Sequence, residues 1–203
     1  SVIPLAQSHD ILKATHLKHH AHTNDPDSDP DFFHGNAKNW WEAAVNVNVS
    51  YNEDGPALKA IEKHLEEDPK FKEALEKGGS WGFLFYFAQI ILAVLYPLET
   101  LLLWWIPKRV ATSYLGIVFS YFPHSGLGKG RYTDTRFWTN KMPRFLNHSM
   151  QIHTMHHMYP RICHYDEAKA IEALKPFMIE RGMPGAEYIP VSYTHLTLPT
   201  SVT

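Results

Sequence analysis

Two short histidine clusters are the residues of this sequence with the clearest capacity for chemistry. Both clusters have the pattern HxxHH. Their members are His16, His19 and His20 in the first cluster and His153, His156 and His157 in the second. On a helix, positions i, i+3 and i+4 lie on one face, so the three imidazoles of each cluster point in one direction. Because imidazole is a common metal ligand, we predict that both clusters bind metal.

The number of imidazoles predicts more than one metal ion. Six rings exceed the four ligands of one structural zinc ion, so we expect two ions if the clusters meet. Imidazole suits iron, zinc, copper and nickel, and the spacing therefore does not select a metal. His124 follows an apolar segment and is a further candidate ligand. Asp25, Asp29 and Asp31 could accept hydrogen bonds from ring N–H groups, or could be ordinary solvated turn residues.

For the other histidines and polar neighbours we expect ordinary surface or core roles. These are His9, His22, His34, His64, Asn147, His148, Gln151 and His164. The sequence has no GxSxG, Walker or CxxCH motif, and its glycine-rich segment 126–130 lacks the GxGxxG spacing of dinucleotide sites. Any electrons that the chemistry needs must therefore come from another molecule.

The composition excludes several classes of protein. The chain has 203 residues, 44% of them apolar, and a net charge of −2, which argues against a disordered chain and a strongly basic nucleic-acid binder. Cys163 is the single cysteine, so no intrachain disulfide can form. Stability must come from packing, from metal or from a membrane.

The polar parts of the chain are expected to be mostly helical. We predict a helix from Asp10 to Asn24, which the following Asp-Pro steps end because a residue before proline disfavours helical geometry. Residues 32–52 are ambiguous, since their valines alternate with asparagines as in a strand while paired tryptophans suggest a membrane-interface anchor. Pro56 to Lys77 is expected to form two short charged helices.

Two apolar segments, about 82–106 and 107–123, are expected to cross a membrane as an antiparallel pair with a tight turn at Ile106 to Arg109. The alternative is a buried hairpin in a soluble protein, against which stand two tryptophans beside Lys108 and Arg109. Two crossings would place both histidine clusters on one side. More basic residues follow the second segment than lie in the turn, which favours the cytoplasmic side.

We therefore expect an all-α fold, a membrane-embedded helical bundle with two transmembrane helices and a cytosolic, histidine-rich helical cap. Residues 1–190 are expected to form one partial domain. The last segment, 191–203 (VSYTHLTLPTSVT), shares no composition with the rest and is interpreted as a tail derived from a sequencing adapter. His195 is for that reason not a candidate site residue.

The assembled residues resemble the integral-membrane fatty acid desaturase superfamily. The resemblance rests on THLKHHAHTNDPDSDPD (15–31), WWIPKRVATSYLGIVFSYFPH (104–124), RYTDTR (131–136) and HTMHHMYPR (153–161). It implies a non-haem di-iron centre that uses O₂ to desaturate or hydroxylate a membrane lipid chain, with electrons from a ferredoxin or small cytochrome. It also implies that both HxxHH clusters and His124 are iron ligands. The segment 104–124 and the closing LKPFMIERGMP look closer to β-carotene hydroxylases, so a carotenoid substrate is the alternative.

One feature of the superfamily has no counterpart in this sequence. The first histidine box, HxxxH or similar at the end of an earlier span, is not found before His16, where only His9 occurs. We expect the missing box and the first pair of spans to precede Ser1 in a longer parent. On this hypothesis the parent is an enzyme, while the present chain holds an incomplete site and is inactive.

Two other classes of function remain open from the residues alone. A non-redox membrane protein that binds or transports metal would need polar ligands inside the membrane, where only Gln89 and Glu99 are available. A zinc-dependent membrane hydrolase would need a general base near the metal, and the sequence has no HExxH motif.

Overall fold

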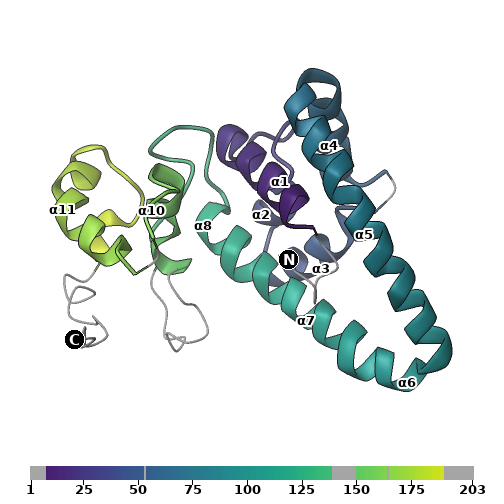
Figure 1. Cartoon of the computed structure of the whole chain (residues 1–203). Helices are drawn as coiled ribbons and strands as arrows, with labels where there is room; N and C mark the ends of the chain where they lie inside the picture. The colour runs from purple at the N-terminus through teal and green to yellow at the C-terminus, as the bar shows by residue number, and fades with distance from the viewer. Residues whose placement is uncertain (1–7, 53, 139–149, 164, 190–203) are drawn as a thin grey trace, which may run out of the picture.

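The computed structural model describes residues 8–52, 54–138, 150–163 and 165–189 (Figure 1). Within these ranges the chain is helical and contains no strand, as the all-α prediction requires. Its α-helices are α1 (His9–His22), α2 (Phe32–Gly35), α3 (Trp40–Val49), α4 (Pro56–Glu67), α5 (Pro69–Leu95), α6 (Pro97–Thr100), α7 (Ile106–Leu115), α8 (Phe122–His124), α10 (His153–Met158) and α11 (Glu167–Glu180). Wider π-helical turns are η2 (Leu101–Trp105) and η3 (Gly116–Tyr121), and 3₁₀ turns are η4 (Met150–Ile152) and η5 (Ala186–Tyr188).

Helix α1, which carries the first histidine cluster, has boundaries set by its sequence. The Ser8 side chain accepts a hydrogen bond from the Ile11 N–H at 3.3 Å and so caps the helix. At the other end Thr23 leaves the helical region, and Asn24 adopts a left-handed conformation with φ 61°. The prediction of a helix ending near Asn24 is confirmed within two residues.

Residues 40–49 form helix α3, so the strand-like alternation of valine and asparagine was misleading. The asparagines have polar partners on other elements: Asn46 donates to the Phe33 carbonyl at 3.1 Å and Asn48 to Ser113 Oγ at 2.9 Å. Asn39 caps the helix by accepting from the Glu42 N–H. Because these polar contacts lie across the tertiary structure, the period of apolar residues alone could not reveal the helix.

The second short helix expected to end at Lys77 is wrong. Asp68 caps a much longer helix, α5, by accepting from the N–H groups of Lys70 and Phe71. The paired glycines at 78 and 79 do not interrupt α5, because Gly78 packs closely against α1.

The chain reverses direction at Tyr96 and Pro97, where α5 ends and α6 begins (Figure 1). The tight turn predicted at Ile106 to Arg109 is wrong, since these residues begin α7 within a helical run from Pro97 to His124. Pro97 lacks an N–H and so breaks the ladder, whereas Pro107 follows the widened turn η2 and the helix continues through it. The boundaries of the two apolar arms therefore differ from the predicted 82–106 and 107–123.

The two arms of this helical hairpin expose much of their apolar surface. Among the described residues, α5 is the helix long and apolar enough to cross a membrane. Phe83, Val94 and Leu103 are 73%, 75% and 78% exposed. A buried hairpin in a soluble protein would cover these side chains, so the arrangement favours a lipid environment.

The histidine-bearing elements gather at the open end of the hairpin, away from the bend at α6 (Figure 1). Helix α1 packs along α5, α3 packs along α7 and η3, and α8 ends the second arm. Helices α10 and α11 pack on a small core that includes Met155, Met178 and Met183. The hairpin thus returns the chain to the level at which α1 lies.

The α1–α5 contact provides a test of this packing. In Gly78→Ala, the added methyl would meet Ser8 Oγ and lie 2.6 Å from Ile11 Cγ1, so we expect destabilisation by about 1–3 kcal/mol. In Gly79→Ala, no described atom lies within 4 Å of the new methyl, and better helix propensity should stabilise the protein by roughly 0.5–1 kcal/mol. Unfolding of both variants in one detergent measures the difference, and equal shifts would contradict the close contact.

Candidate metal centre

Three elements distant in sequence bring their histidines together. Helix α1 carries the first cluster, α10 carries the second, and His124 ends α8. Of the seven predicted ligands, six form two groups that could each hold a metal ion, with ligand atoms within 4.8 Å of one another. The groups are His16, His20 and His156, and His19, His124 and His157. Each group therefore takes residues from both HxxHH clusters.

In the first group, one ring nitrogen lies within hydrogen-bonding distance of two others. The Nε2 atom of His16 lies 3.0 Å from Nε2 of His20 and 3.0 Å from Nε2 of His156. A neutral imidazole nitrogen has either one proton or one lone pair in the ring plane, so His16 Nε2 can make one good hydrogen bond and not two. A metal ion between the three rings would bind a lone pair from each of them.

The second group is oriented by hydrogen bonds on the opposite side of its rings. His19 Nδ1 donates to Asp29 Oδ1 at 2.8 Å, and His124 Nδ1 donates to the Asp134 carbonyl at 3.2 Å. Their Nε2 atoms are then left with lone pairs that face the group. His124 Nε2 is buried and has no hydrogen-bond partner in the described part of the chain. An orphaned, buried lone pair of this kind fits a metal ligand.

His153 belongs to neither group among the described residues. Its Nε2 lies 3.2 Å from Nε2 of His157, and its ring packs edge-on against His124 at 5.7 Å between centroids. Phe119 also packs against it, with ring centroids 4.7 Å apart. His153 is thus placed beside the second group, and its predicted role as a ligand stays a prediction.

Burial keeps most of these imidazoles uncharged. Burial, reinforced by His19, lowers the pKa of His16 from 6.5 to about 4, and burial with its histidine neighbours lowers that of His20 to about 2. Burial likewise lowers the pKa of His124, His156 and His157. Neutral rings offer lone pairs to a metal at neutral pH, whereas protonated rings would not.

His19 differs from the other histidines because it has an acidic partner. Burial acts to lower its pKa, but the hydrogen bond that His19 donates to Asp29 and the charges of Asp31 and Asp29 together outweigh burial and raise it. A carboxylate on Nδ1–H also fixes the tautomer and makes Nε2 a stronger donor of electrons to a metal.

The three aspartates that follow α1 have separate roles. Asp29 is the one bonded to a ligand of the second group. Asp31 lies 3.6 Å from His34 and accepts a hydrogen bond from Tyr51 at 3.1 Å. Asp25 forms an ion pair with Lys129 at 2.7 Å. Of the two readings left open by the sequence, the ligand-orienting one applies to Asp29.

The other histidines lie outside the two groups. His64 is buried with Nε2 2.7 Å from the Ser28 carbonyl, and the His22 ring packs against it at a tilt of 34°. His34 is buried near Asp31, and His9 is exposed. Gln151 lies in the 3₁₀ turn η4 before α10. Three residues of this set fall outside the described ranges: Asn147, His148 and His164.

Two partners of the second group were not anticipated from the sequence. The Thr23 hydroxyl lies 3.5 Å from His157 Nδ1, and the carbonyl of Asp134 accepts from His124. Thr23 directly follows α1 and could have been suspected for that reason. A backbone carbonyl carries no signal in the sequence, so the Asp134 contact could not have been found.

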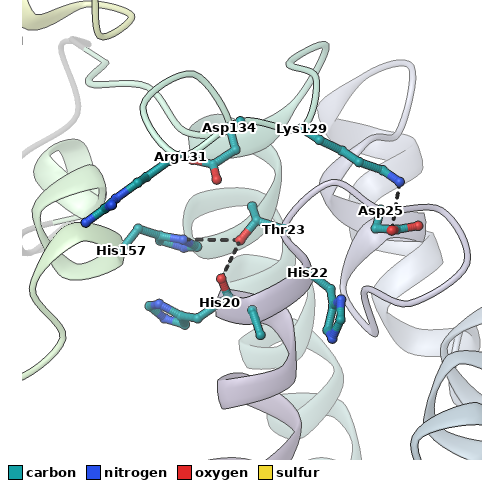
Figure 2. A pocket seen from close by; sticks show the side chains of 10 residues that line it. His20, His22, Thr23, Asp25, Lys129, Arg131, Asp134 and His157 are labelled. Carbon is teal, nitrogen blue, oxygen red and sulfur yellow. Dashed lines mark hydrogen bonds and ion pairs between the residues drawn. The ribbon is translucent and has the colours of Figure 1, made fainter. Parts of the chain in front are cut away.

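Cavities open on two sides of the histidines. A polar cavity of about 370 Å³ is lined by His20 and His157 and by the charged side chains of Lys129 and Arg131 (Figure 2). A second cavity of about 320 Å³ reaches His153 and His156 and has Phe119 among its apolar walls. The centre is therefore accessible from a charged side and from an apolar side.

Comparison with known proteins decides the family. The family model described as fatty acid desaturase matches residues 1–188. The chain belongs to the fatty acid desaturase family. No curated protein and no solved structure matches the chain. Members of the desaturase family are membrane-associated oxidoreductases that generally use two iron ions, and the two imidazole groups fit that requirement.

The hydrogen bond from His19 to Asp29 can be tested by metal binding. Asp29→Asn replaces the charged acceptor with a neutral amide, and we expect metal affinity to fall about 10–100-fold. Asp27→Asn is the matched control, because Asp27 is exposed in the same loop and should leave affinity unchanged. Titration of the purified protein in detergent with Zn²⁺ or Co²⁺ measures both constants. Equal affinities in the two variants would exclude the orienting role of Asp29.

Proposed function

We propose that this desaturase-family chain supplies the iron-binding core of an O₂-dependent oxidoreductase that desaturates or hydroxylates a lipid hydrocarbon chain. The observation that carries the proposal is the pair of three-imidazole groups, each built from both HxxHH clusters. Two three-imidazole groups exceed the four ligands of a single structural zinc, and membership of the desaturase family, which generally uses two iron ions, favours iron among the metals that imidazole binds.

Iron at the two groups would activate O₂ and remove hydrogen from an unactivated C–H bond. In desaturation, O₂ takes two electrons and two protons from the substrate, two electrons from the donor protein and two protons from solvent, and forms two waters. In hydroxylation, one oxygen atom enters the C–H bond and the other forms water with two donor electrons and two protons. The chain contributes the ligands His16, His20 and His156, and His19, His124 and His157, with Asp29 holding the His19 ring.

The hydrocarbon is proposed to approach from the apolar side. Phe119 and Ile162 line the cavity that reaches His156, and Phe119 also contacts His16 with ring centroids 5.8 Å apart. The exposed apolar arms would place this cavity close to lipid, so a chain could enter without crossing water. A fatty acyl chain is the proposed substrate, and a carotenoid is the alternative.

Electrons are proposed to come from a ferredoxin or small cytochrome, since no redox group of the sequence could supply them. The metal site is proposed to face the cytoplasm. Its support is the basic segment after the second apolar arm, which includes Lys129, Arg131 and Arg136.

Metal analysis tests the class of function. We expect about two iron ions per chain after expression in an iron-supplied host, because two imidazole groups are present. Zinc without iron would instead favour a non-redox metal-binding protein.

The first histidine box is absent from this sequence, so turnover is expected only from a longer chain that carries one. Lipid and pigment profiles of hosts expressing either form test this, and turnover by the present chain would contradict it.

The apolar cavity gives a second test of the same proposal. Phe119→Trp should fill space that a hydrocarbon needs, and we expect substrate turnover to fall at least 10-fold with iron content unchanged. Phe83→Trp is the matched control, because Phe83 is 73% exposed on α5 and far along the chain from the histidines. Product analysis by mass spectrometry in a turnover-competent form measures the effect. Undiminished turnover in Phe119→Trp would remove this cavity from the substrate path.

A further inference from the structure

Asn24 lies shortly after the helix of the first histidine cluster. It belongs to neither imidazole group, but its backbone N–H, its side-chain NH₂ and its amide oxygen all form hydrogen bonds. It is 4% exposed. Its backbone N–H donates to Asp29 Oδ2 at 2.8 Å. Its side-chain amide donates to the Asp134 carbonyl at 2.8 Å and to the Gly128 carbonyl at 3.2 Å. Its amide oxygen accepts from Asn36 Nδ2 at 3.0 Å, which fixes the amide so that its NH₂ group faces the two carbonyls.

Two of these partners, the Asp29 carboxylate and the Asp134 carbonyl, also orient ligands of the second imidazole group. Asp29 accepts from His19 through Oδ1 while it accepts from Asn24 through Oδ2. The Asp134 carbonyl accepts from His124 and from Asn24 at the same time, one bond to each lone pair. Asn24 is therefore one bond removed from both His19 and His124.

The backbone of Asn24 makes this double contact possible. Its φ of 61° is in the left-handed region, which asparagine tolerates better than other residues with side chains. This conformation turns the chain so that the N–H points towards Asp29 while the side chain points towards the loop that contains Gly128 and Asp134. An alanine would have neither the tolerance for this φ nor the amide.

We propose that Asn24 is a positioning residue that couples His19 of α1 to His124 of α8, so that both present Nε2 to the same metal ion. The hydrogen-bonded chain runs from His19 through Asp29, Asn24 and the Asp134 carbonyl to His124. The first group, His16, His20 and His156, shares no hydrogen bond with this chain of bonds among the described residues. Its rings only pack against His19, with centroids 5.9 Å apart for His16 and 5.8 Å apart for His20, so we expect it to depend far less on Asn24. Loss of the Asn24 amide thus weakens one metal site selectively.

The inference rests on the proposed metal centre but is tested separately from its redox chemistry. Co²⁺ is the probe, because it binds imidazole sites and its visible absorption reports ligand geometry. The protein is the full chain purified in detergent. Redox function would fail if the wild-type chain took up zinc without iron in cells, whereas the role of Asn24 is judged only by changes in Co²⁺ binding.

Asn24→Gly is the decisive variant, since glycine keeps the left-handed backbone and its N–H but removes the amide. We expect Co²⁺ affinity at the second group to fall by about 10-fold or more, with an altered visible spectrum. Asn24→Asp is the second variant, in case the glycine form does not fold. Its carboxylate keeps the backbone tolerance but cannot donate to two carbonyls.

Two backgrounds separate the metal sites. In His16→Ala, which removes a ligand of the first group, Asn24→Gly should still weaken Co²⁺ binding by about 10-fold. In His124→Ala, which removes a ligand of the second group, Asn24→Gly should have no further effect on the remaining site. Asn46→Ala is the structural control. Asn46 is buried and donates a hydrogen bond of 3.1 Å to the Phe33 carbonyl, and this bond involves no member of the two imidazole groups. The substitution should lower stability and leave Co²⁺ affinity unchanged.

A selective loss in the His16→Ala background supports the role of Asn24. Unchanged Co²⁺ affinity in both Asn24 variants would overturn it. An equal loss in the two histidine backgrounds would also overturn it, because general destabilisation affects both sites alike.

Discussion

The structure depends on a cluster of uncharged imidazole nitrogens. More of these nitrogens meet at the centre than hydrogen bonds between them can pair. His16 Nε2 has two ring nitrogens at 3.0 Å, and His124 Nε2 is buried without a hydrogen-bond partner among the described residues. Removing such polar atoms from water is costly unless something binds them. A cation bound by each group, as proposed, would supply the missing interaction, and folding and metal binding would then be linked.

Every larger element of the fold serves this convergence. The chain reverses at Pro97, and the second arm therefore returns to α1. This reversal places His124 beside His19, which is more than 100 positions earlier in the chain. The loop after α1 supplies Asp29, which bonds to His19. Helix α10, which packs on the small core with α11, supplies the second histidine cluster. Because α1 packs closely on α5 at Gly78, the first cluster is fixed to the same hairpin that carries His124.

The two sides of the centre have different physical character. Lys129 and Arg131 line one cavity, and Phe119 lines the other. Charged side chains are favourable only where water remains, and apolar walls are favourable where it is excluded. The proposed oxidation of a hydrocarbon with electrons from a soluble donor would use both environments.

The sequence alone determined the residue types, the helical spacing of the HxxHH clusters and, within two residues, the bounds of the helix before the Asp-Pro steps, because these depend on neighbours within a few positions. It could not determine that each imidazole group mixes both clusters, that His153 lies beside the groups, that α3 is a helix or that the chain reverses at Pro97. Those outcomes depend on which helices pack together and at what distance. Contacts such as His16 to His156 join atoms 140 residues apart, and only the tertiary structure decides them.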